Sequence, residues 1–309
     1  MLLFLRNTLI CGMLFIALPS ILSGQEGIIN AQNDSINYKG RQRLVTGTFL
    51  AGYAGTMTYL SLGWYSNTDL GPFHFFDDSD EWLQMDKVGH VLGGYTTTRY
   101  LIGLEKWAGV PKKKALLYAG IGGFMAMNSI EVLDGFAVQW GASWSDIAAN
   151  AGGVGLALGN HALWGEERIQ LKFSYLPSPF TKVDSLQRLF GSNPAEWLLK
   201  DYNGQTYWLS FRMHSFLPEG SLKKAWPSWL NLAAGYGGEG MIGRYGIDPI
   251  EQIRAREYRQ YYLGLDIDFQ QIKTSSEVLK FILTGLNFIK IPLPAIRFDR
   301  QGVALRAFQ

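Results

Sequence analysis

Ionisable side chains occur in pairs inside otherwise apolar parts of this sequence. Asp86 and His90 are four residues apart. Glu131 and Asp134 are three apart and follow a nearly unbroken apolar run over residues 115–130. Each pair would therefore share one face of a helix. Because burying an unpaired carboxylate is costly, Glu131 and Asp134 need polar partners. The candidate partners are His90, Lys87 and Asn150.

A third polar group opens the next apolar segment. Asp146 and Asn150 are again four residues apart, which places them on one helical face. Ser143 precedes Asp146 by three residues, just before an apolar run. This Ser-x-x-Asp pattern is typical of a capping box, so we expect Ser143 to be a helix N-cap. That role leaves the Asp146 carboxylate available for a second one.

If these groups converge, they could form a single site. One imidazole and several carboxylates suit a divalent metal ion, for which the candidate ligands are His90, Glu131 and Asp146. The same groups could instead act as an acid–base pair. The candidate catalytic residues are Asp86, Lys87, His90, Glu131, Asp134, Asp146 and Asn150. A buried hydrogen-bond network that only holds the helices together is the alternative, and spacing alone favours it.

Four glycine-punctuated apolar segments would carry these groups. We expect helices over residues 41–65, 86–107, 112–139 and 144–164. Repeated glycines lower helix propensity but let helix backbones approach closely. Gly155 and Gly159 form a small-xxx-small step. We expect the glycines to pack helices within the chain, and a homo-oligomer through these glycine-rich helices is the alternative.

The sequence does not clearly identify these four segments as membrane spans. Each is about 20 residues long, the length that a span needs, but polar residues interrupt them. If all four crossed a membrane from outside, the acidic segment 67–82 would lie in the cytoplasm and the lysines at 112–114 outside. This reverses the positive-inside bias. We therefore favour a helical bundle that does not span the membrane or is only partly inserted in it.

The second half of the chain alternates apolar and polar residues, which is typical of strands. The alternation is clearest near residues 207–213 and 261–269 and weaker at 230–232 and 296–308. A late helix is expected at 276–288, capped by Ser275 or Ser276. The fold class is therefore α+β, with a glycine-rich apolar four-helix bundle followed by an antiparallel strand-rich region. The expected domains are a signal peptide at 1–24, a flexible leader at 25–40, a helical domain at 41–165, a linker at 166–205 and the strand-rich region at 206–309.

The first residues resemble a secretory signal. Arg6 precedes a mostly apolar stretch over residues 9–22, and the small residues Ser23 and Gly24 follow it. Cys11, the only cysteine, lies inside this stretch, so the mature chain would have no disulfide and no cysteine metal site. A net charge of +2 does not support a nucleic-acid partner. A charged fraction of 17% and 36 glycines favour an envelope protein in contact with a membrane.

The order of the three polar groups also indicates a family. Asp86-Lys87-x-x-His90, then Glu131-x-x-Asp134, then Ser143-Trp144-x-Asp146-x-x-x-Asn150 resembles the YfiM-like periplasmic lipoproteins and, more distantly, the VanZ-like membrane proteins. The resemblance covers residues 83–165, and the greater length looks like the Bacteroidetes-type version of the family. It implies a membrane-associated protein on the periplasmic side of a Gram-negative-type envelope, with no settled chemistry. The chain departs from the family because no cysteine stands at the end of its leader.

Two functions follow as hypotheses. The first is a structural or binding role at the membrane, with an envelope lipid or glycan surface as partner. The second is a membrane-associated envelope hydrolase, with or without a metal ion, that uses the polar groups. A transporter is disfavoured by the reversed charge bias. No Gly-x-Ser-x-Gly, P-loop or His-Glu-x-x-His motif is present, and the glycine-rich segment 235–240 is better explained as a turn or a strand bend.

Overall fold

The computed structural model describes residues 38–59, 61, 65, 68–243 and 257–307. Helices precede an antiparallel six-stranded sheet, which confirms the predicted α+β class. The predicted signal peptide and Cys11 lie outside the described residues, as does the predicted leader up to residue 37.

The chain divides into two compact units. The first comprises the described residues up to 77 together with 93–165 and 273–286. The second comprises 78–92, 166–272 and the described residues from 287 onward.

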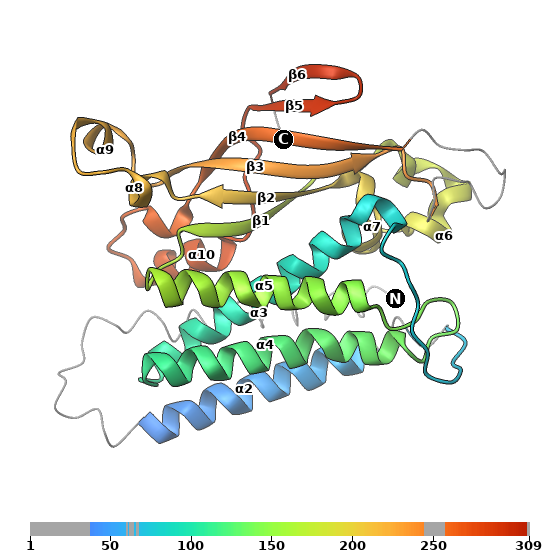
Figure 1. Ribbon diagram of the computed structural model, residues 1–309, viewed down its shortest axis with the longest axis horizontal. Helices are drawn as coiled ribbons and strands as arrows, with labels where there is room; N and C mark the ends of the chain where they lie inside the picture. The colour runs from blue at the N-terminus through green and yellow to red at the C-terminus, as the bar shows by residue number, and fades with distance from the viewer. Residues whose placement is uncertain (1–37, 60, 62–64, 66–67, 244–256, 308–309) are drawn as a thin grey trace. The chain divides into compact units, whose positions relative to one another are not determined.

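The first unit contains the predicted apolar helices (Figure 1). They are α2 (Tyr38–Tyr59), α3 (Met85–Trp107), α4 (Lys112–Asp134) and α5 (Trp144–Leu163), with the late helix α10 (Glu277–Leu286). α3 is one continuous helix, and its first two turns are counted with the second unit. α4 ends earlier than the sequence predicted because residues 135–142 pair with the segment at 70–76. Single bridges join Leu70 to Ala137 and Phe75 to Ala142.

Glycines bring the helices of the first unit together, as predicted for α3 and α4. A Cβ atom on Gly94 of α3 would lie 2.5 Å from the carbonyl oxygen of Asn150 in α5. Gly120 of α4 similarly faces Leu158 of α5. On α5 itself, no described atom lies within 4 Å of a Cβ built on Gly155 or Gly159. The expected packing within the chain is therefore not found at this small-xxx-small step.

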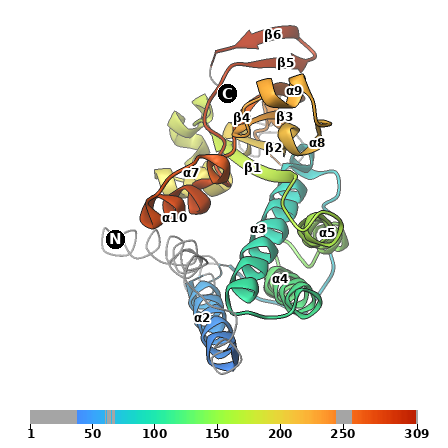
Figure 2. The ribbon, with the colours of Figure 1, turned by 90° about the vertical axis from the view of Figure 1, so that its left-hand side faces the viewer.

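The second unit is built on one meandering sheet, whose strands lie side by side in chain order (Figures 1 and 2). They are β1 (Ile169–Tyr175), β2 (Gln205–Phe211), β3 (Leu230–Glu239), β4 (Tyr258–Ile267), β5 (Ala295–Asp299) and β6 (Gly302–Arg306). β1 occupies part of the segment that the sequence indicated as a linker. The turn at Arg300 and Gln301 divides the predicted strand at 296–308 into β5 and β6. Most of the glycine-rich segment 235–240 belongs to β3 and does not form the predicted turn. Gly235 packs against the Trp208 ring, which would lie only 2.8 Å from a Cβ atom at this position.

Short helices make the remaining connections. They are η3 (Glu81–Gln84), η4 (Pro179–Lys182), η5 (Asp184–Leu186), α6 (Gln187–Phe190), α7 (Pro194–Lys200), η6 (Tyr202–Gly204), α8 (Met213–Phe216), α9 (Ser221–Ala225) and η7 (Phe269–Gln271).

The sheet buries polar side chains on one of its faces. Lys172 and Asp266 form an ion pair of 2.7 Å with side chains that are almost unexposed. Asp268 accepts hydrogen bonds from Gln170 and Arg212, both at 2.9 Å. Buried charges are stable only when they are paired and hydrogen-bonded, which these groups are. The core of the second unit is therefore partly a polar network.

Candidate functional site

A left-handed turn sets the start of α3. Trp82, Leu83 and Gln84 have φ values of 51°, 52° and 61°. This conformation costs about 1–2 kcal/mol per non-glycine residue. Packing offsets the cost, because Leu83 is buried in an apolar cluster and its carbonyl accepts a hydrogen bond from the Tyr236 hydroxyl. The turn thereby fixes the direction in which α3, and with it Asp86, begins.

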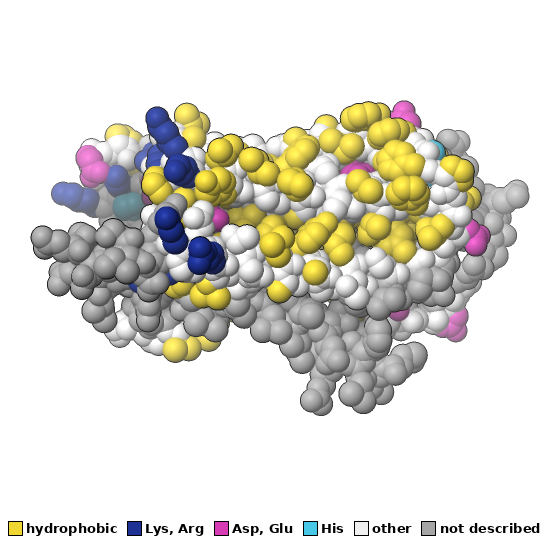
Figure 3. Space-filling model, turned by 90° about the horizontal axis from the view of Figure 1, so that it is seen from below, with side chains coloured by type: hydrophobic (Ala, Val, Ile, Leu, Met, Phe, Trp, Pro, Cys, Tyr) yellow, Lys and Arg dark blue, Asp and Glu magenta, His cyan; other side chains and the backbone are white. Residues whose placement is uncertain are grey.

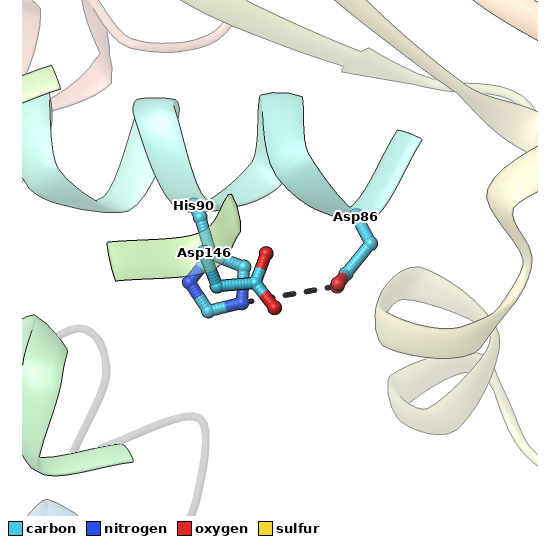
Figure 4. A group of neighbouring side chains, drawn as sticks. All are labelled: Asp86, His90 and Asp146. Carbon is cyan, nitrogen blue, oxygen red and sulfur yellow. Dashed lines mark ion pairs between the residues drawn. The ribbon is translucent and has the colours of Figure 1, made fainter. Parts of the chain in front are cut away.

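The first turn of α3 holds an ion-pair network. The Asp86 carboxylate accepts a hydrogen bond of 2.9 Å from the Tyr202 hydroxyl. Lys87 Nζ lies 3.1 Å from Asp86 Oδ2 and 2.6 Å from the Asp78 carboxylate. One turn further on, His90 Nε2 lies 3.8 Å from Asp86 Oδ1 (Figure 4). Asp86 and His90 thus lie on one face of α3, as their spacing predicted. Asp78 and Tyr202 were not predicted because no spacing rule links them to α3.

A buried tyrosine lies beside this turn. The Tyr207 hydroxyl lies 3.0 Å from the position of a Cβ on Gly89 and donates a hydrogen bond of 2.7 Å to Gln205. Burial, and then the Asp86 charge, raise the pKa of Tyr207 well above its usual range. Tyr207 is therefore a neutral wall of the site and not a source of protons.

The two carboxylates at the end of α4 have hydrogen-bond partners both before α4 and in the segment that follows it. Glu131, which is buried, accepts a hydrogen bond of 3.0 Å from the backbone N–H of Ser143. Asp134 accepts hydrogen bonds from the Tyr65 hydroxyl and the Trp140 indole N–H, both at 2.5 Å. Burial, followed by the charges of Asp134 and Glu131, raises the pKa of Tyr65. The sequence indicated that both carboxylates need partners, but it did not identify these three.

Ser143 caps α5, which confirms the capping prediction. Its hydroxyl accepts a hydrogen bond of 3.2 Å from the backbone N–H of Asp146. Glu131 and Ser143 together therefore fix the first turn of α5, where the buried Asp146 side chain begins the polar face. One turn later, Asn150 donates a long hydrogen bond of 3.4 Å to Asn128.

Helix geometry relates His90 to Asp146. Gly94 of α3 lies against the backbone of Asn150 in α5. His90 is one turn before Gly94, and Asp146 is one turn before Asn150, so each continues the same face of its helix. Asp86, His90 and Asp146 each offer one ligand atom, and these three atoms lie within 4.8 Å of one another (Figure 4). The observed group therefore contains Asp86 in place of Glu131, which the sequence had suggested as a ligand. The Glu131 carboxylate instead accepts a hydrogen bond from the backbone N–H of Ser143.

This group has the donor types of a divalent cation site. One imidazole nitrogen and two carboxylate oxygens suit a hard or borderline metal ion. Lys87 competes with a cation for Asp86, because its ammonium group lies 3.1 Å from Oδ2. Oδ1 of Asp86 is the atom that faces His90. The arrangement can therefore bind a cation through Oδ1 or exchange a proton between His90 and a carboxylate.

Residues 74–160 match the model of the DUF2279 family, described as a predicted periplasmic lipoprotein. All the candidate site residues and Ser143 lie in this segment, which is less than half of the chain. No curated protein and no solved structure matches the chain. The match supports an exported, membrane-associated periplasmic protein of unknown function.

The first unit also exposes a long apolar surface. Among the described residues, α4 alone is long and apolar enough to cross a membrane, judged by length and composition only. Only 22% of its most apolar stretch is buried. Figure 3 shows apolar side chains gathered along the surface of the molecule, with basic side chains near one end. The exposed apolar side chains of α4 are Leu117, Tyr118, Ile121, Phe124, Met125 and Val132, which we call the α4 face.

Proposed function

We propose that this envelope protein binds a phospholipid membrane through the α4 face. The exposure of the α4 face carries the proposal. A monomeric soluble protein rarely exposes a contiguous apolar patch of this kind, and such a patch usually marks an interaction surface.

The spacing of the α4 face indicates a one-sided contact with lipid. Leu117, Ile121 and Met125 recur every four residues and so form a stripe along one side of the helix. The other side of α4 packs within the unit, where Gly120 faces Leu158 and Gly123 faces Thr98. Lipid would therefore cover one side of α4, and the helix would lie against the bilayer without being surrounded by it.

The two ends of the α4 face have the residues expected at a membrane boundary. Three exposed lysines, at 112–114, stand at the start of α4. Lysines can extend to the headgroups and are attracted to anionic lipids. Exposed aromatic rings gather near the other end, where Phe75 stacks on Trp144 with ring centres 4.7 Å apart. Aromatic side chains are enriched at this depth of a bilayer.

The family match and the YfiM-like and VanZ-like resemblance of residues 83–165 support the same setting, since both point to the envelope. In this proposal the hydrogen bonds of Glu131 and Ser143 keep α5 aligned with α4. The polar residues thus have a structural or binding role at the membrane.

Vesicle flotation tests the proposal. We expect Ile121→Asp with Met125→Asp to reduce binding to vesicles of phosphatidylethanolamine and phosphatidylglycerol at least tenfold, because the desolvation cost of a carboxylate replaces apolar contact. Leu222→Asp is the matched control, since Leu222 is similarly exposed but lies on α9. Circular dichroism confirms that each variant is folded. Equal binding by the wild type and the double variant would remove the α4 face as the contact.

A second candidate function is a membrane-associated hydrolase that uses a divalent metal ion, favoured by the donor atoms of Asp86, His90 and Asp146. When bound, such an ion would activate water for attack. The metal content of purified protein tests this, with His90→Ala and Asp146→Asn as variants. His161→Ala is the control, because His161 lies at the opposite end of α5. The candidate fails if the metal content is the same in the wild type and in His90→Ala.

A further inference from the structure

The sheet of the second unit exposes apolar side chains on the face opposite its polar network. In the register, Tyr261 pairs with Phe298, which pairs with Val303. Leu263, Ile296 and Leu305 form a parallel row. The β4–β6 face consists of Tyr261, Leu263, Leu265, Ile296, Phe298, Val303 and Leu305, all of which are exposed. On the neighbouring strands, Tyr207 of the same face belongs to a buried apolar cluster with Leu83 and Met85, and Phe173 packs against this cluster.

This apolar face ends at an open strand edge. β6 is the last strand of the sheet, and in the described part of the chain no strand pairs with its outer side (Figures 1 and 2). The opposite edge is covered, because the backbone of Phe173 in β1 exchanges hydrogen bonds of 2.8 Å with Phe288 and Lys290. An uncovered edge is a template for another strand. Val303 and Leu305 on β6 are also the most exposed members of the face, at 70% and 76%.

Protection of this edge is weak. Natural edge strands usually carry charges, a proline or a bulge that prevents pairing. β6 has the sequence Gly302-Val-Ala-Leu-Arg306, with its charge at the end and no proline. Its register with β5 is regular over all five residues, so no bulge interrupts it. β6 therefore has the features of a strand that pairs with another chain.

The edge also identifies the kind of partner. Hydrocarbon offers no hydrogen-bonding groups, so immersing an unpaired edge in lipid would leave its N–H and C=O groups unsatisfied. A protein strand satisfies these groups and covers the apolar side chains beside them. Lipid alone is thus a poor occupant of this edge, although it suits the α4 face.

We propose that two copies of this chain pair antiparallel through β6. Pairing centred on Ala304 overlaps all five residues and places Val303 of each copy opposite Leu305 of the other. Arg306 then lies opposite Gly302, so no like charges face each other. Cross-strand neighbours lie about 4.5–5.5 Å apart, close enough for the two most exposed apolar side chains to contact their counterparts. The six-stranded sheet becomes continuous across the two-fold axis.

Disulfide crosslinking tests the pairing in detergent-solubilised full-length protein with Cys11→Ser. The variant Ala304→Cys would place two sulfurs on the two-fold axis, where opposite Cα atoms lie about 4.5–5.5 Å apart, within disulfide range. We expect most of Ala304→Cys to form a covalent dimer under mild oxidation and Leu222→Cys, the exposed control, to stay monomeric. Equal crosslinking of the two variants would overturn the proposal.

Light scattering provides a second readout. We expect the wild type to be dimeric at micromolar concentration. Val303→Lys with Leu305→Lys should be monomeric, because lysines would then face lysines across the axis. Leu222→Lys should stay dimeric. A monomeric wild type, or a dimer that survives the double lysine change, contradicts the proposal. A double lysine variant that stays dimeric but loses vesicle binding also contradicts it, because lipid would then be what covers this face. The α4 face is tested by different substitutions, so the two failures are distinguishable.

Discussion

Replacing Gly94 with alanine is the most direct perturbation of the helix packing that carries the polar residues. Gly94 lies on α3, and its hydrogen takes the place of a side chain against α5. A Cβ at this position would lie 2.5 Å from the Asn150 carbonyl oxygen and 3.3 Å from its carbonyl carbon. Both are backbone atoms, so the contact cannot be relieved by rotating a side chain.

The expected magnitude follows from this geometry. Ordinary contact begins at 3.4 Å, so α3 and α5 must separate by about 0.9 Å at this point. Overpacking costs about 1–3 kcal/mol, and a backbone clash belongs at the upper end. Alanine regains about 1 kcal/mol of helix propensity. The net destabilisation is therefore about 2 kcal/mol.

Gly103→Ala is the matched control, because Gly103 lies on the same helix with no atom within 4 Å of a built Cβ. Here only the propensity term acts, and we expect about 1 kcal/mol of stabilisation. Urea unfolding in detergent, followed by tryptophan fluorescence, measures both variants. Their free energies of unfolding should differ by about 3 kcal/mol in the stated direction. Equal stabilities, or a more stable Gly94→Ala, would refute the close approach of α3 to α5.

Three further predictions concern single interactions. Ser143→Ala should destabilise α5 by about 1 kcal/mol in the same unfolding assay. Ser143→Asn should restore most of the loss, because asparagine also caps helices and adds no charge beside Glu131. An unchanged Ser143→Ala variant contradicts the cap. Asp266→Asn should lower the free energy of unfolding by about 3–5 kcal/mol, since it leaves Lys172 charged and buried. The double variant Lys172→Met with Asp266→Leu should lose less stability than this single variant. A double variant that loses as much stability as the two single changes together would contradict the buried pair. Burial lowers the pKa of Lys290 to about 8, so between pH 8 and the ordinary value of 10.5 the unfolded chain binds more protons than the folded one. Stability should therefore rise with pH across this window in the wild type more than in Lys290→Met, and parallel pH profiles would contradict the assignment.

Local sequence rules predicted much of the fold. Apolar periodicity gave the four helices of the first half, and alternation indicated β2 and β4, because both patterns depend on neighbours within one element. β1 was missed because it contributes polar side chains such as Gln170 and Lys172 to a buried network, which the alternation rule reads as an exposed face. The predicted end of α4 lies beyond the observed end, because the distant segment 70–76 pairs with the loop that follows the helix.

The candidate site was predictable only in part, for the same reason. Helical spacing identified the pairs within each helix, and the cap at Ser143 follows from a local motif. Partners from other segments have no local signature. Tyr65 reaches Asp134 across 69 residues, and Tyr202 reaches Asp86 across 116. The sequence therefore identified residues that need partners but not which residues supply them.

Membrane contact through the α4 face is tested most directly by fluorescence quenching. An environment-sensitive label is attached at Met125→Cys or, as control, at Leu222→Cys, both with Cys11→Ser, and vesicles carry bromine on their acyl chains. Met125 is 66% exposed and Leu222 60%, so neither label disturbs a buried core. We expect strong quenching and a blue shift at position 125 and little change at 222. Weak quenching at 125, equal to that at 222, would contradict the proposed membrane contact.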